Sequence, residues 1–100
     1  MKLKLSFITD PGHGWLAVPL YHLNALGIKD HISGYSYKSS SGIAYLEEDL
    51  DAGTFFKAAK AAGWEIEISE KYSDPCPIRN YPSYPNHPDW AKLSGWKHAA

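Results

Sequence analysis

The chain has 100 residues, with ten Lys or Arg against eleven Asp or Glu, so its formal net charge is −1. This length suits one domain, because half of it would bury too little surface to fold alone. With 44% hydrophobic and 21% charged residues, the composition is globular and argues against wholesale disorder. The near-neutral charge, with Arg79 as the sole arginine, disfavours nucleic acid as a partner, because non-specific binding to a polyanion requires a basic surface.

The first third of the chain predicts a β-hairpin followed by a short helix. Apolar and polar residues alternate over 2–8, which predicts a strand with one buried face. A turn at 10–14, whose glycines permit positive φ, connects it to a second strand at 15–18. A helix is predicted over 19–26, with Pro19 in its first turn and Gly27 at its end.

A second hairpin is predicted from strands at 35–38 and 43–46. Tyr35 and Tyr37 share a face of it, and Tyr45 pairs across. Rings on an open sheet face can stack single-stranded bases, whereas buried tyrosines need only a partner for the hydroxyl. Because basic companions are missing, packing in the core or against the C-terminal segment is favoured, and single-stranded nucleic-acid binding is kept as an alternative.

A second helix and a fifth strand follow. The acidic run before the helix offers Asp49 or Asp51 as its N-cap. The helix covers 52–62, and the strand covers 64–68. The order β-β-α-β-β-α-β predicts an α+β fold with a mainly antiparallel sheet.

Residues 1–70 are expected to form the compact domain and residues 71–100 an extended arm. Five of the seven prolines lie within 74–88, which forbids a helix or a central strand there. A disordered linker would be poor in aromatic rings, yet this part of the chain contains five: Tyr72, Tyr81, Tyr84, Trp90 and Trp96. We therefore expect the arm to lie on the domain with these rings as anchors.

Several strings of the sequence are distinctive together. They are TDPGHGWL at 9–16, VP at 18–19, LGI at 26–28, SGYSY at 33–37, YLEED at 45–49, IRNY at 78–81 and SY at 83–84. With these strings the chain resembles small proteins of phage, prophage and plasmid genomes. The resemblance implies a mobile-element origin and a bacterial host, but it carries no activity and no functional residue. The single cysteine, Cys76, allows no intrachain disulfide, which favours a reducing location, the host cytoplasm.

The turn at 10–14 is the first candidate site. Asp10 and His13 could form an acid–base pair, because a carboxylate can orient an imidazole. The structural alternative, in which Asp10 accepts backbone N–H groups of the turn, is favoured because Asp, Pro and Gly are common for that reason alone. No third catalytic group is evident from the sequence.

The acidic run is the second candidate site. It consists of Glu47, Glu48, Asp49 and Asp51. A helix N-terminus favours one or two acids, and the remainder predict a negative patch for a basic partner. Aromatic residues anchor interfaces, so Trp15, Tyr35 and Tyr37 are assigned to the interaction site with these acids.

No known catalytic, phosphate-binding or metal-binding spacing is present, so no metal, cofactor or membrane span is expected. The leading hypothesis is a non-enzymatic accessory protein that binds and inhibits or redirects a host or defence-system protein. A small ligand-binding or hydrolytic module at Asp10 and His13 is the alternative from another class, and homo-oligomerisation is left open.

Overall fold

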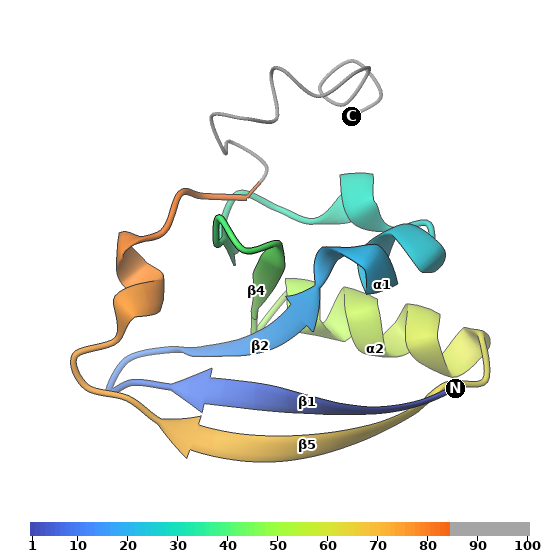
Figure 1. Ribbon diagram of the computed structural model, residues 1–100, viewed down its shortest axis with the longest axis horizontal. Helices are drawn as coiled ribbons and strands as arrows, with labels where there is room; N and C mark the ends of the chain where they lie inside the picture. Colours follow the sequence, from blue (N-terminus) through green and yellow to red (C-terminus); the bar gives the residue numbers. More distant parts are fainter. Residues whose placement is uncertain (85–100) are drawn as a thin grey trace.

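A five-stranded sheet organises the protein, and the computed structural model describes residues 1–84 (Figure 1). The elements in chain order are β1 (Lys2–Thr9), β2 (Gly14–Pro19), α1 (Leu20–Ala25), η1 (Lys29–His31), β3 (Tyr37–Lys38), β4 (Ile43–Glu47), α2 (Asp51–Ala61), β5 (Glu65–Tyr72) and η2 (Pro77–Asn80). The strands lie in the order β3-β4-β2-β1-β5, and only β1 and β5 are parallel neighbours. The predicted α+β class with a mainly antiparallel sheet is confirmed.

The hairpin of β1 and β2 forms as predicted, but its glycines are needed for another reason. Neither Gly12 nor Gly14 has a positive φ, so the predicted reason is wrong. The ring of Phe7 lies against Gly14 instead, and a Cβ at Gly14 would lie 2.6 Å from Phe7 Cζ. A side chain at Gly14 would therefore require the Phe7 ring to move, so the constraint comes from packing between the strands and not from backbone conformation.

Both helices end as the glycines predict. Gly27 and Gly63 follow α1 and α2 with φ of 71° and 79°, a left-handed conformation that glycine adopts at little cost. The predicted N-cap of α2 is wrong: Leu50 occupies that position and no side chain caps it. Asp51 is the first helical residue and is only 1% exposed, because its carboxylate serves a buried network described below.

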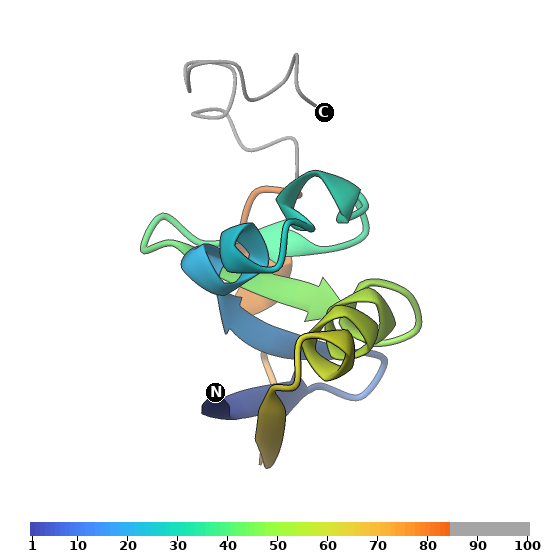
Figure 2. The ribbon, with the colours of Figure 1, turned by 90° about the vertical axis from the view of Figure 1, so that its right-hand side faces the viewer.

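The two faces of the sheet are covered by different parts of the chain. The helices cover one face, over a core that includes Leu16, Val18, Leu46 and Phe55. On the opposite face, the segment that contains η2 covers Trp15 with Cys76 and Ile78. Figure 2 shows both helices in front of the strands and η2 behind them. The sheet is thus buried on both sides where β2 and β4 meet.

The segment that follows η2 closes the β3 edge of the sheet. Lys38 N–H donates to Pro82 O (3.0 Å), and Tyr84 N–H donates to Ser36 O (2.7 Å). Ser83 forms a bridge with Tyr37 between these bonds. The chain then returns to the helix side, where Tyr84 is fully buried in the main core.

The aromatic residues predicted as anchors of the arm differ in their surroundings. Tyr81 packs against Tyr45, with ring centroids 5.3 Å apart, and the Tyr84 hydroxyl donates to Lys29 O. Tyr72 ends β5 and is 67% exposed, so it anchors nothing within residues 1–84. Trp90 and Trp96 lie outside the described residues. The predicted division at residue 70 falls within β5, and the separate arm over 71–100 stays a prediction.

Candidate functional site

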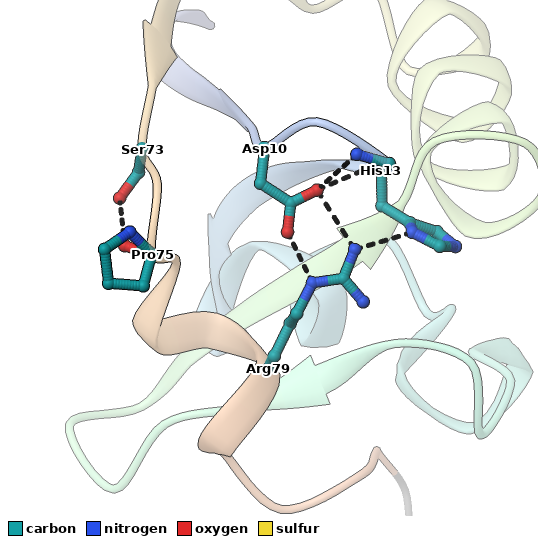
Figure 3. Close-up of polar contacts among 6 residues, drawn as sticks. Asp10, His13, Ser73, Pro75 and Arg79 are labelled. Carbon is teal, nitrogen blue, oxygen red and sulfur yellow. Dashed lines mark hydrogen bonds and ion pairs between the residues drawn. The ribbon is translucent and has the colours of Figure 1, made fainter.

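Arg79 joins the turn at 10–14 to the C-terminal segment. Asp10 Oδ1 accepts the N–H groups of Gly12 (2.9 Å) and His13 (2.8 Å), which confirms the turn-forming interpretation. The Arg79 guanidinium forms two bonds to the Asp10 carboxylate, one of them Nη2 to Oδ1 at 3.0 Å. Its Nη2 also lies 2.8 Å from His13 Nδ1 (Figure 3). Because a guanidinium has no acceptor, Nδ1 accepts this bond.

This arrangement argues against acid–base chemistry at Asp10. The carboxylate contacts the backbone of His13, and the Arg79 guanidinium lies between it and the imidazole. The ion pair with Arg79, together with the two backbone N–H groups, holds the pKa of Asp10 well below its usual range. Asp10 is therefore a structural group that is ionised at neutral pH, and the predicted Asp–His pair does not form through the side chains.

Trp15 lies at the centre of this cluster. Its ring is stacked with His13 at 5.9 Å, and the Arg79 guanidinium carbon lies 5.2 Å from the ring centroid. Tyr37 meets it edge-on at 6.1 Å. Trp15 is only 1% exposed, so it is the floor of the site and not the exposed anchor that its assignment to an interaction surface implies.

A pocket of about 420 Å³ opens beside this cluster and brings the separate candidates together. Its lining is His13, Trp15, Gly34, Tyr35, Tyr37, Glu47, Asp49, Leu50 and Arg79. His13 of the turn at 10–14 thus lines the same cavity as Tyr35, Tyr37 and two members of the acidic run. Tyr35 is 74% exposed and lies in the turn before β3, outside the strand in which it was predicted.

A buried hydrogen-bond network positions the acidic and tyrosine sides of the pocket. The Asp51 carboxylate accepts Ser33 N–H (3.0 Å) and the hydroxyls of Ser33 (2.6 Å) and Ser36. The Ser36 hydroxyl oxygen in turn accepts Glu47 N–H (2.9 Å). This network fixes the turn that carries Tyr35 against β4. Asp51 is consequently a positioning residue, and its assignment to the acidic surface is wrong because it does not reach solvent.

The charge within the pocket is negative. A Glu47 carboxylate oxygen accepts Asp49 N–H (2.9 Å), which draws the two acids together. Within residues 1–84, neither acid has an ion pair, whereas the only cation in the lining, Arg79, is paired with Asp10. Glu48 is exposed and does not line the pocket.

The remaining predicted tyrosine does not belong to an open face. Tyr45 lies opposite Tyr37 in the sheet, as predicted, and its ring packs against Tyr81. Burial, followed by the proximity of Tyr81, raises the pKa of the Tyr45 hydroxyl. The favoured interpretation of this residue, packing against the C-terminal segment, is confirmed.

Arg79 belongs to the site, although it was not among the residues predicted there. It lies 69 positions after Asp10, and no local pattern connects the two. Two features of the sequence could have pointed to Arg79: it is the sole arginine, and it lies in the IRNY string.

In the part of the chain that the structure describes, no three His, Cys, Asp or Glu side chains are grouped so as to hold a metal ion. No helix within residues 1–84 is long and apolar enough to cross a membrane. Comparison of the chain with family models, curated proteins and solved structures finds no match.

Proposed function

We propose that the chain is a non-enzymatic accessory protein, of the mobile-element type that its sequence resembles, and that it binds and inhibits or redirects a host or defence-system protein. The pocket beside Trp15 takes a basic side chain of that partner. The observation that carries the proposal is that Glu47 and Asp49 share a cavity with exposed Tyr35, while Arg79, the only cation that residues 1–84 contribute to its lining, is already paired.

The lining suits a guanidinium or ammonium group. Carboxylates bind either cation through charge-assisted hydrogen bonds, and a guanidinium also stacks on aromatic faces. Tyr35 and Tyr37 supply rings next to the two acids. The volume of about 420 Å³ lies within the range of ligand pockets, which is ample for one long side chain.

The state of the polar groups favours binding over catalysis. Asp10 is fully occupied by Arg79 and two N–H groups, so its carboxylate is not available to act on the His13 imidazole. Reaction at this site would require both residues to leave their partners, whereas binding of a cation uses carboxylates that are already free of ion pairs within residues 1–84.

The first test is calorimetric titration with a tetra-arginine peptide and with its uncharged tetra-citrulline counterpart. We expect Asp49→Asn to weaken binding of the arginine peptide about tenfold, as loss of one charged hydrogen bond implies. Glu48→Gln is the matched control, because it removes the same charge one residue outside the pocket. Equal effects of the two substitutions, or equal binding of both peptides, would contradict recognition in the pocket.

The second test identifies the partner. The protein is used to capture proteins from a bacterial lysate, and the captured proteins are identified by mass spectrometry. We expect a near-stoichiometric partner that is retained by Glu48→Gln and lost with Asp49→Asn. The same proteins recovered with both variants, or none with the unmodified protein, would refute the proposal.

A further inference from the structure

The two edges of the sheet differ in how they are covered. The β3 edge is bonded to residues 82–84, as described above. β5 is eight residues long, and within residues 1–84 it pairs only with β1. Both ribbon views place β5 at the margin of the described part, with no described element beyond it (Figures 1 and 2). Such an edge is a template for pairing with another strand.

The pairing with β1 determines which backbone groups of β5 face outward. Glu65 N–H donates to Met1 O (2.8 Å), and Ser73 N–H donates to Thr9 O (2.8 Å). Odd-numbered residues of β5 therefore bond to β1. The even-numbered residues present their N–H and C=O groups to the outer edge. They are Ile66, Ile68, Glu70 and Tyr72.

We propose that two copies of the chain pair through this edge as antiparallel β5 strands, with Ser69 on the two-fold axis. A symmetric antiparallel pair must match outward-facing residues with one another. With Ser69 on the axis, Ile66 lies opposite Tyr72 of the second copy and forms a hydrogen-bonded pair. Glu67 lies opposite Lys71 of the second copy, at a non-hydrogen-bonded pair, where side chains are closest.

The charges on β5 complement themselves in this register. Glu67 already pairs with Lys4 on β1 (3.6 Å). In the dimer, each Glu67 lies between two lysines, the Lys4 of its own copy and the Lys71 of the other. Charged residues on an edge strand ordinarily prevent association. Here Glu67 and Lys71 lie on the same face of β5 at equal distances from Ser69, so an antiparallel second copy places opposite charges side by side.

The opposite face of the strand supplies apolar contacts. Tyr72 is 67% exposed and Ile68 is 38% exposed, both large for apolar side chains on a strand. In the proposed dimer Tyr72 gains a cross-strand contact with Ile66, an aromatic–β-branched pair of the stabilising kind. Ile68 is covered by the aliphatic stem of Glu70 from the second copy.

Sedimentation equilibrium of the full chain tests the dimer. We expect a mass approaching twice the 11.2 kDa of one chain as the concentration rises through the micromolar range. Glu67→Lys places a positive charge opposite Lys71 of the other copy at both symmetry-related positions of the dimer. It should therefore weaken dimerisation about tenfold. The double variant Glu67→Lys/Lys71→Glu should recover it. Glu65→Lys is the matched control: it creates the same defect within one copy, opposite Lys2, but does not face Lys71 of the second copy.

Disulfide cross-linking tests the register. At the two-fold axis, two Ser69→Cys residues would have Cα atoms about 4.5 Å apart, within the range of a disulfide. We expect oxidation to cross-link Ser69→Cys and not Ile68→Cys, each in a Cys76→Ser background. A single-chain mass at all concentrations, no cross-link at Ser69→Cys, or preferential cross-linking of Ile68→Cys would overturn the proposal.

Discussion

Replacing Tyr84 with alanine removes a ring that enters the main core from the C-terminal segment. The side chain is fully buried, and its hydroxyl donates to Lys29 O. Truncation of a buried aromatic residue to alanine destabilises proteins by about 3–5 kcal/mol. This is a large part of the 5–15 kcal/mol that is typical of a domain of this size. Tyr84→Phe keeps the ring and loses only the hydroxyl bond, which is worth about 1 kcal/mol.

Urea unfolding followed by circular dichroism measures both losses. Tyr21→Ala is the matched control: it removes the same side chain from a position that is 69% exposed, where we expect a change within about 0.5 kcal/mol. The expected order of stability is Tyr21→Ala close to the unmodified protein, then Tyr84→Phe, then Tyr84→Ala. If Tyr84→Ala were no less stable than Tyr21→Ala, the argument that the C-terminal segment completes the core would be refuted.

Three further substitutions test the packing and the polar networks. Gly14→Ala places a Cβ 2.6 Å from Phe7 Cζ and should destabilise by about 1–3 kcal/mol in urea unfolding, with Phe7→Leu recovering part of the loss. No recovery would contradict the steric cause. Asp51→Asn replaces the charged acceptor of three hydrogen bonds and should lower the free energy of unfolding by about 2–3 kcal/mol, whereas a loss below about 0.5 kcal/mol would show that the network is dispensable. Arg79 lowers the pKa of Asp10 in the folded protein below its value in the unfolded chain, which is about 3.9. The ion pair therefore stabilises the folded state fully at pH values above about 3.9, and this stabilisation is lost as the pH falls below that value. The stability difference between the unmodified protein and Asp10→Asn should therefore shrink in acid, and a pH-independent difference would contradict this assignment.

Local sequence patterns predicted most of the helices and strands. The contacts that individual residues of these elements make depend on residues far away in the chain. The alternation over 2–8 and the glycines that end both helices correspond to β1, Gly27 and Gly63 in the structure. The reason for Gly14 could not be predicted, because it depends on a ring that packs across the hairpin. The identity of a turn residue is visible in sequence, whereas the neighbour that requires it is not.

The acidic run shows the same limit at the site. Its members look equivalent in sequence, yet they have three different environments. Asp51 is buried and accepts hydrogen bonds from two serine hydroxyls. Glu47 and Asp49 line the pocket, and Glu48 faces solvent. Their roles differ because β4 ends and α2 begins within the run, so successive side chains point in different directions.

The parallel pairing of β1 and β5 has a consequence for the order of folding. Contacts between β1 and β5 join residues 2–9 to residues 65–72 and close a long loop, so they are slow to form and depend on nearly all of the described chain. During synthesis the β1–β2 hairpin emerges early, but one side of β1 lacks its hydrogen-bond partners until residues 65–72 have left the ribosome. The nascent protein therefore passes through a period in which β1 is itself an open edge, and the time needed to synthesise the chain from the end of β2 to the end of β5 sets the length of that period.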